Sequence, residues 1–345
     1  MTLRVALVGA GYWGSNLLQV FHATDGFAVV AVCDVDAELL TRIKARFPQV
    51  SVSTSLNEVL DDPTVDAVVV ATPPASHFSI AHAVLCAGKH VWVEKPLALR
   101  FEEGRRLVAA AQERRLTLFV DETFLYDPLI QQVRARLLAG VVGQIHHVSL
   151  ERTGMGRIRR DSTVWWNSAP HDISILRYVL NSHVRKISVV GHAFLQPGIE
   201  DVVWASLQME CGVSVHLYLN WLFPEKKAPM MVVGERGMIS YEGRFEKRAW
   251  RRYTYRLGVA DFAAAREDAP VPIEHYEVAE EVSGDFQQEP LAYACAAFRE
   301  SILTGTPASS GGKHVLHTLA VLEAGAQSLA QNGAWITVLD ETAKG

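Results

Sequence analysis

The 345-residue chain lacks the features that would direct it into a membrane or out of the cell. Its four cysteines are isolated, and none has the paired spacing of a zinc or redox motif. No apolar run approaches the roughly 18 residues that a membrane span requires. The N-terminal apolar residues run straight into a glycine-rich turn, without the basic start and cleavage site of a secretory signal. We therefore expect a cytoplasmic protein without a metal site.

The chain also lacks an excess of positive charge, since its formal net charge is -5. This balance gives no general attraction for nucleic acid or an anionic membrane, so a small-molecule partner is favoured. Apolar residues make up 49% of the chain and charged residues 21%, as in ordinary globular proteins. Because single hydrophobic cores stop growing at about 250–300 residues, the length predicts two domains.

A glycine-rich turn near the N-terminus is the most informative motif that is present. Gly9, Gly11 and Gly14 follow the apolar run from Leu3 to Val8 with the spacing G-x-G-x-x-G. In dinucleotide-binding folds the first glycine permits a tight turn, the second lets the backbone approach the pyrophosphate, and the third lets the helix pack closely on the strand. Asp34 ends the next apolar run, where its carboxylate can bind the ribose hydroxyls and disfavour a 2′-phosphate. The motif predicts NAD(H) as the coenzyme.

The order of apolar and helical segments predicts two different sheets. Up to about residue 122, short apolar strands such as His90 to Val93 alternate with helical stretches such as Glu102 to Glu113. From Lys186 to Tyr255, β-rich segments follow one another with short turns, as in an antiparallel sheet. We expect an α/β Rossmann domain with a doubly wound parallel sheet over residues 1–122. An α+β domain with a large, mostly antiparallel sheet would occupy residues 123–345.

Glu94-Lys95-Pro96 directly follows the predicted strand His90 to Val93. Ligands bind at the carboxyl end of the strands in open parallel sheets. A lysine at that edge can donate a hydrogen bond to a substrate hydroxyl and stabilise the alkoxide that develops as hydride leaves. The alternative is a surface lysine paired with Glu94.

The chain resembles the Gfo/Idh/MocA oxidoreductase family along nearly its whole length. The segments that carry the resemblance are the glycine turn with Asp34, Ala71-Thr72-Pro73 with His77, Glu94-Lys95-Pro96, and Asn167-Ser168-Ala169-Pro170-His171-Asp172. The resemblance implies a Rossmann domain followed by a domain with a mainly antiparallel sheet, and a homodimer or homotetramer. It implies coenzyme contacts from a set of residues around the turn and the strand ends: Gly9, Gly11, Tyr12, Trp13, Gly14, Asp34, Thr72, Pro73, His77, Glu94 and Lys95.

The same resemblance assigns the chemistry to Lys95 and His171. A histidine with an ordinary pKa of about 6.5 can accept a proton during oxidation or donate one during reduction. Many relatives have an aspartate four residues before this histidine, where this chain has Asn167. Asparagine cannot act as a general base, but it can orient His171 or bind the substrate. Asp172 is interpreted as a capping or structural residue.

The segment from Arg152 to Arg160, followed by Trp165 and Trp166, is the best clue to the substrate. It resembles a branch of the family associated with sugar nucleotides and cell-surface polysaccharides. Arginines can hold a diphosphate and tryptophan can cover a sugar face, whereas the alternative is a solvated basic loop beside packing aromatics. The expected substrate contacts are Lys95, Tyr126, Arg157, Trp166, Asn167 and His171, although a core role for Tyr126 is equally plausible.

These observations favour an NAD-dependent dehydrogenase or ketoreductase that acts on a secondary alcohol of a sugar, with a nucleotide-linked sugar as the first choice. An inositol or free-sugar dehydrogenase is the second enzyme hypothesis. A non-catalytic dinucleotide sensor is the alternative from another class. The strand from Val213 to Trp221 carries apolar residues on both alternating faces, so one face of its sheet is expected to form a subunit interface.

Overall fold

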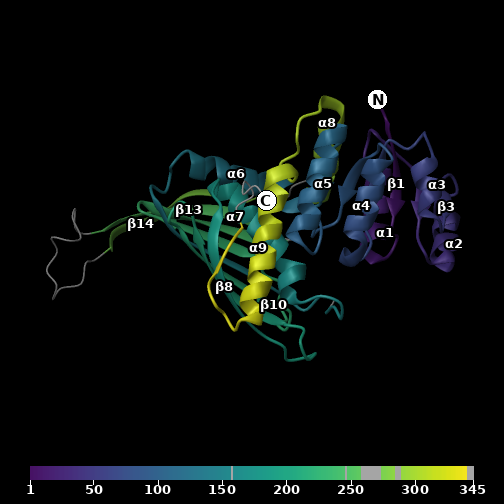
Figure 1. The fold of residues 1–345 in the computed structure, drawn as a ribbon. Helices are drawn as coiled ribbons and strands as arrows, with labels where there is room; N and C mark the ends of the chain where they lie inside the picture. The colour runs from purple at the N-terminus through teal and green to yellow at the C-terminus, as the bar shows by residue number, and fades with distance from the viewer. Residues whose placement is uncertain (157, 245–246, 258–272, 284–288, 340–345) are drawn as a thin grey trace. The chain divides into compact units, whose positions relative to one another are not determined.

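The computed structural model describes the chain except for residues 157, 245–246, 258–272, 284–288 and 340–345. The chain forms two compact units, labelled by their elements in Figure 1. Unit 1 comprises residues 1–127, 288–323 and 339–345, and unit 2 comprises residues 128–287 and 324–338. Both units are therefore discontinuous in sequence. A division into domains at residue 122 stays a prediction.

Unit 1 contains a parallel sheet in which six strands of the described residues follow the order β3-β2-β1-β4-β5-β6. The strands are β1 (Leu3–Val8), β2 (Phe27–Cys33), β3 (Ser51–Ser53), β4 (Ala67–Val70), β5 (His90–Val93) and β6 (Leu118–Val120). The connections run outward in opposite directions from β1 and β4. Dinucleotides bind at this switch point in doubly wound sheets. The predicted parallel sheet is confirmed.

Helices supply the apolar surfaces that bury this sheet. They are α1 (Tyr12–Ala23), α2 (Ala37–Arg46), α3 (Leu56–Asp61), α4 (His77–Cys86), α5 (Phe101–Arg114), α8 (Pro290–Thr304) and the first part of α9 (Gly312–Ala330), with the 3₁₀ turns η1 (Pro74–Ser76) and η2 (Thr123–Tyr126). Phe298 of α8 packs edge-on against Trp92 of β5 at 5.5 Å between ring centroids, and Trp92 stacks on Phe119 of β6 at 4.4 Å. Helix α8, which is distant in sequence, thus completes the aromatic core around β5 and β6.

Unit 2 contains a larger sheet, in which nine strands of the described residues follow the order β14-β13-β12-β11-β7-β10-β9-β8-β15. The strands are β7 (Ile145–Thr153), β8 (Val184–His192), β9 (Val202–Met209), β10 (Ser214–Asn220), β11 (Pro229–Gly234), β12 (Gly237–Arg244), β13 (Lys247–Leu257), β14 (Ile273–Ser283) and β15 (Ile336–Thr337). Neighbouring strands are antiparallel except β7 and β10, which run parallel. The prediction of a mostly antiparallel sheet is confirmed.

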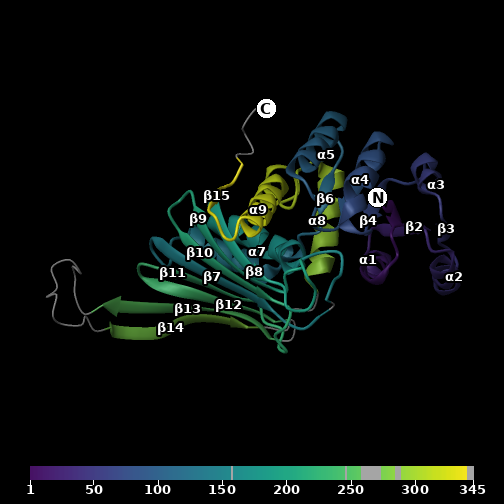
Figure 2. The same cartoon turned by 60° about the horizontal axis from the view of Figure 1, so that its bottom comes forward.

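One face of the large sheet is covered by helices of unit 2, α6 (Pro128–Leu138) and α7 (Val164–Leu180). Figure 2 shows α7 lying against the strands. In β10, Val215, Leu217 and Leu219 are buried and alternate with the more exposed side chains between them. On the opposite face, Trp204 of β9 stacks on Tyr218 at 5.3 Å and still exposes 48% of its surface. The subunit interface expected on one face of this sheet stays a prediction.

Candidate coenzyme and substrate sites

The glycine turn is packed tightly at its first and third glycines and open at its second. Gly9 has a φ of +88°, and a Cβ at Gly9 would lie 2.8 Å from the carbonyl carbon of Ala71. A Cβ at Gly14 would lie 2.0 Å from the Gly9 carbonyl oxygen, so only glycine lets α1 approach β1 this closely. Gly11, the residue before α1, has no atom within 4 Å of its Cβ position. The turn therefore leaves open the N-terminus of α1, where a pyrophosphate fits.

Asp34 lies beside this turn. Its Oδ2 accepts a hydrogen bond of 2.6 Å from the backbone N–H of Ala10, and its Oδ1 accepts one of 2.9 Å from Asp36. The carboxylate is half-buried, and Val35 next to it is 93% exposed. The acid predicted to bind the ribose is thus held next to the predicted pyrophosphate site, as the dinucleotide motif requires.

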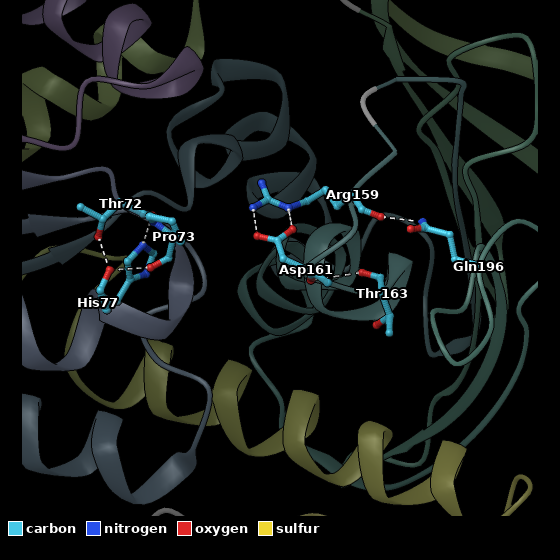
Figure 3. A network of polar contacts seen from close by, with 9 residues as sticks. Thr72, Pro73, His77, Arg159, Asp161, Thr163 and Gln196 are labelled. Atoms are coloured by element: carbon cyan, nitrogen blue, oxygen red, sulfur yellow. Dashed lines mark hydrogen bonds and ion pairs between the residues drawn. The ribbon is translucent and has the colours of Figure 1, made fainter. Parts of the chain in front are cut away.

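His77 joins the loop after β4 to the end of β5, and Figure 3 shows it beside Thr72 and Pro73 of that loop. The two ring nitrogens of His77 each lie 2.8 Å from a backbone carbonyl oxygen, one of Thr72 and one of Pro96. The side chain is fully buried, and this burial lowers its pKa. The hydroxyl of Ser76 donates a hydrogen bond of 2.8 Å to Thr72 Oγ1. His77 therefore holds the Thr72-Pro73 loop against the Lys95-Pro96 segment, and its direct contact with coenzyme stays a prediction.

Two acidic residues meet at the carboxyl ends of β5 and β6. Val93 pairs with Val120, so Glu94 and Asp121 follow directly at the same edge of the sheet. The indole N–H of Trp13 donates a hydrogen bond to Glu94 Oε1, and the hydroxyl of Thr123 donates one to Asp121 Oδ1. Burial raises the pKa of both carboxyl groups, and the neighbouring Asp121 adds to the large rise at Glu94.

Lys95 is half-buried beside this pair, and its positive charge opposes the rise in both carboxyl pKa values. Its place directly after β5 is the one that the sequence predicted. Sequence reasoning overlooked Asp121. The signal was present, because an acid also directly follows the next parallel strand.

A second polar pair near this edge was also overlooked. His314 Nε2 of α9 lies 3.1 Å from Glu122 Oε2, and both side chains are largely buried. The hydroxyl of Tyr126 lies 2.9 Å from Ser310 Oγ, and its ring stacks on Phe119 at 5.4 Å. Tyr126 is only 7% exposed, so these contacts favour the core role. A substrate contact by Tyr126 stays a prediction.

Helix α7 of unit 2 carries three of the predicted substrate residues, Trp166, Asn167 and His171. Thr163 caps its N-terminus by accepting a hydrogen bond from the N–H of Trp166. Asn167 and His171 are four residues apart and therefore lie on the same face of the helix. Trp166, Asn167 and His171 are all half-buried. This arrangement suits the orienting role predicted for Asn167, which stays a prediction together with the catalytic role of His171.

Asp172 belongs to the interior of unit 2. Its two carboxylate oxygens accept hydrogen bonds of 2.7 and 2.9 Å from the guanidinium of Arg152 on β7. Side-chain exposure is 4% for Asp172 and 18% for Arg152. A buried pair with this fork geometry ties α7 to the sheet, which is the structural interpretation of Asp172.

The basic segment between β7 and α7 is described in part, and Arg157 lies outside the described residues. The guanidinium of Arg159 forms two hydrogen bonds, of 2.8 and 2.7 Å, with the carboxylate of Asp161 (Figure 3). The backbone carbonyl of Arg159 accepts a hydrogen bond of 2.9 Å from Gln196. Arg159 thus already has an anionic partner, and the roles of Arg157 and Trp166 toward substrate stay predictions.

The strand order of unit 1 and the open glycine turn beside an acidic residue place the protein in the class of NAD-binding Rossmann proteins. More narrowly, the chain belongs to the Gfo/Idh/MocA oxidoreductase family. Residues 3–122 match the family model described as an oxidoreductase family with an NAD-binding Rossmann fold. Residues 130–240 match the GFO/IDH/MocA C-terminal domain.

Relatives of several activities share parts of this sequence. A 4-carboxy-2-hydroxymuconate-6-semialdehyde dehydrogenase of Sphingobium sp. is 28% identical over 64% of this chain and 72% of its own length. An inositol 2-dehydrogenase of Acidothermus cellulolyticus is 29% identical over 64% of this chain and 66% of its own length, just under two thirds. The WlbA dehydrogenase of Bordetella pertussis, solved with NADH and UDP-GlcNAcA, shares the fold. Its TM-score is 0.77 at 24% identity, over 99% of this chain and all of the other.

None of the helices within the described residues is long and apolar enough to cross a bilayer.

Proposed function

We propose that this protein is an NAD-dependent dehydrogenase or ketoreductase acting on a secondary alcohol or ketone of a sugar, and that the sugar is nucleotide-linked. The observation that supports the proposal most directly is the place of Lys95. It follows β5 at the carboxyl edge of the sheet, next to the Glu94 carboxyl that binds Trp13 of the coenzyme turn. When bound, NAD accepts or returns a hydride.

Under this proposal the chain supplies the proton chemistry. Lys95 donates a hydrogen bond to the reacting oxygen and stabilises negative charge on it during oxidation. His171 accepts the hydroxyl proton, or returns it in the reductive direction. Asn167, on the same face of α7, orients His171 or the substrate but takes no proton.

A nucleotide-linked substrate is supported by two observations of different kinds. The half-buried Trp166 at the start of α7 offers an aromatic surface for a sugar, and the segment before it is basic. The structurally similar WlbA dehydrogenase was solved with UDP-GlcNAcA, a sugar nucleotide. An inositol or free-sugar dehydrogenase is the second candidate. It is favoured by the similarity to an inositol 2-dehydrogenase and by the pairing of Arg159 with Asp161, which reduces the charge available for a diphosphate.

The decisive experiment is a substrate panel with NAD⁺ and NADH, followed by nicotinamide absorbance. The panel contains UDP-sugars, the corresponding free sugars and inositols, and each compound is also tested with Lys95→Met. Turnover of a UDP-sugar at a kcat/KM well above that of the free sugar supports the first candidate. The reverse ranking selects the second. NADH binding without turnover of any compound overturns both dehydrogenase candidates and favours a non-catalytic dinucleotide sensor.

A further inference from the structure

Glu94 and Asp121 face each other because of the register of two parallel strands. The N–H of Asp121 donates to the carbonyl of Val93, and the N–H of Glu94 donates to that of Val70, so both residues extend the sheet by one position. Glu94 is 8% exposed and Asp121 is 1% exposed. The register therefore brings the two carboxyl groups together at this edge, where the charge of Asp121 raises the pKa of Glu94. Two carboxyl groups in direct contact cannot both be ionised without strong repulsion.

The N–H and O–H groups around the pair leave one buried carboxylate oxygen without a donor. Trp13 donates to Glu94 Oε1 and Thr123 donates to Asp121 Oδ1. Asp121 Oδ2 is buried, and no N–H or O–H of the described residues donates to it under ordinary geometry. A carboxyl group that carries a proton can supply this donor, because its O–H donates to a neighbouring carboxylate oxygen. Glu94 in its acid form is therefore the missing donor.

The charges around the pair also indicate that the two carboxyl groups hold one proton between them. Lys95 is the cation whose charge acts on both carboxyl groups. The charge of Asp121 also acts on Cys295 of α8 and Tyr126 of η2, and burial raises the pKa of both, so both are neutral at pH 7. Two carboxylates against one ammonium leave a buried negative charge, whereas one shared proton leaves the group neutral.

We propose that Asp121 is a positioning residue of the coenzyme site, which shares one proton with Glu94 and thereby holds the indole of Trp13 at the open end of the glycine turn. Trp13 is the second residue of α1, between the open Gly11 and the packed Gly14, and it is 42% exposed. The proton leaves for solvent when the pair is titrated at alkaline pH. The two carboxylates then separate and the Trp13 contact is lost. Any effect on hydride transfer rests on the proposed function, but the shared proton and NADH binding do not.

The first test detects the proton directly by infrared spectroscopy of the carboxyl C=O stretch at pH 7. The wild type should show the band of a buried protonated carboxyl, and Glu94→Gln should lose it. Asp121→Asn should lose it too, because the amide of asparagine can donate to Glu94 and let it ionise. Asp61→Asn at the exposed end of α3 removes a matched charge and should keep the band. A wild type that shows no such band, or the same band in Glu94→Gln, overturns the proposal.

The second test measures the Kd for NADH against pH, with no substrate present. The wild type should bind about tenfold more weakly once the shared proton is lost at alkaline pH, the equivalent of one hydrogen bond. In Glu94→Gln the amide keeps a donor at all pH values, so this alkaline weakening should disappear whatever the affinity at pH 7. Equal alkaline weakening in wild type and Glu94→Gln would disprove the positioning role. Failure of the sugar panel would leave both tests unaffected.

Discussion

The parallel sheet of unit 1 is buried on both faces, whereas the antiparallel sheet of unit 2 is buried on one. All four residues of β4 are buried, and those of β10 alternate between buried and more exposed. A sheet covered on both faces has only its strand ends available for ligands. Polar residues of unit 1 such as Glu94, Lys95 and Asp121 therefore gather where strands end. Unit 2 instead leaves one face of its sheet more exposed, where Trp204 exposes 48% of its surface.

The largest expected effect tests the residues assigned to chemistry in the two units, Lys95 and His171. Lys95→Met keeps much of the length of lysine but removes its charge and donors, and His171→Ala removes the proton acceptor. Loss of a catalytic acid or base lowers turnover by about 10²–10⁴-fold, and Lys95→Met should cost at least as much. The measurement is kcat with saturating NAD⁺, alongside the Kd for NADH.

His22→Ala is the matched control, since His22 is an exposed histidine in the last turn of α1. Near-normal kcat in both catalytic variants, with NADH bound, would contradict the assignment.

The next largest effect is expected from the difference between the packed Gly14 and the open Gly11 in the glycine turn of unit 1. Gly14→Ala places a methyl group 2.0 Å from the backbone oxygen of Gly9, and backbone cannot move aside as a side chain can. Overpacking of this kind costs about 1–3 kcal/mol of unfolding free energy, and we expect the upper end. Gly11→Ala meets nothing within 4 Å and should unfold like the wild type, yet bind NADH more weakly.

Thermal or urea unfolding together with NADH titration separates the two glycine variants. Equal losses of stability in both would show that the close approach of α1 to β1 is not what requires Gly14.

A smaller effect concerns the choice of coenzyme at the edge of unit 1. Asp34→Ala removes the charged acceptor beside the turn, and hydrogen bonds to charged groups contribute about 1.5–3 kcal/mol each. NAD⁺ should bind roughly 10- to 100-fold more weakly, and the gap between NAD⁺ and NADP⁺ should narrow. Isothermal titration with both coenzymes is the measurement. An unchanged affinity for NAD⁺ would place Asp34 outside the ribose pocket.

The smallest effect on the fold is expected at the open face of the unit 2 sheet. Trp204→Ser removes an aromatic side chain that is 48% exposed, so monomer stability should change by less than about 1 kcal/mol. If this face joins subunits, light scattering should show a shift toward the monomer. Val35→Ser, at the 93% exposed residue beside Asp34, is the control for losing an exposed apolar side chain. A wild type that is monomeric at micromolar concentration would refute the interface outright.

The sequence alone determined the local features of this protein. The spacing of three glycines after an apolar run specifies a strand, a tight turn and a helix, because each glycine answers a steric need of its immediate neighbours. Helix and strand periods separated the two kinds of sheet, and the predicted limits of β1 and β5 agree with the structure. The place of Lys95 at a strand end followed from the same local pattern.

The tertiary structure decided which distant segments meet. Phe298 of α8 packs against Trp92 of β5, although it lies about 200 residues later in the chain. The order of segments along the sequence does not indicate this contact. The pairing of Glu94 with Asp121 depends on the register of two strands. The pairing of Arg152 with Asp172 depends on how α7 packs on the sheet of unit 2. Such contacts join residues far apart in sequence through burial and charge, whereas periodicity reports only on residues within a few positions of one another.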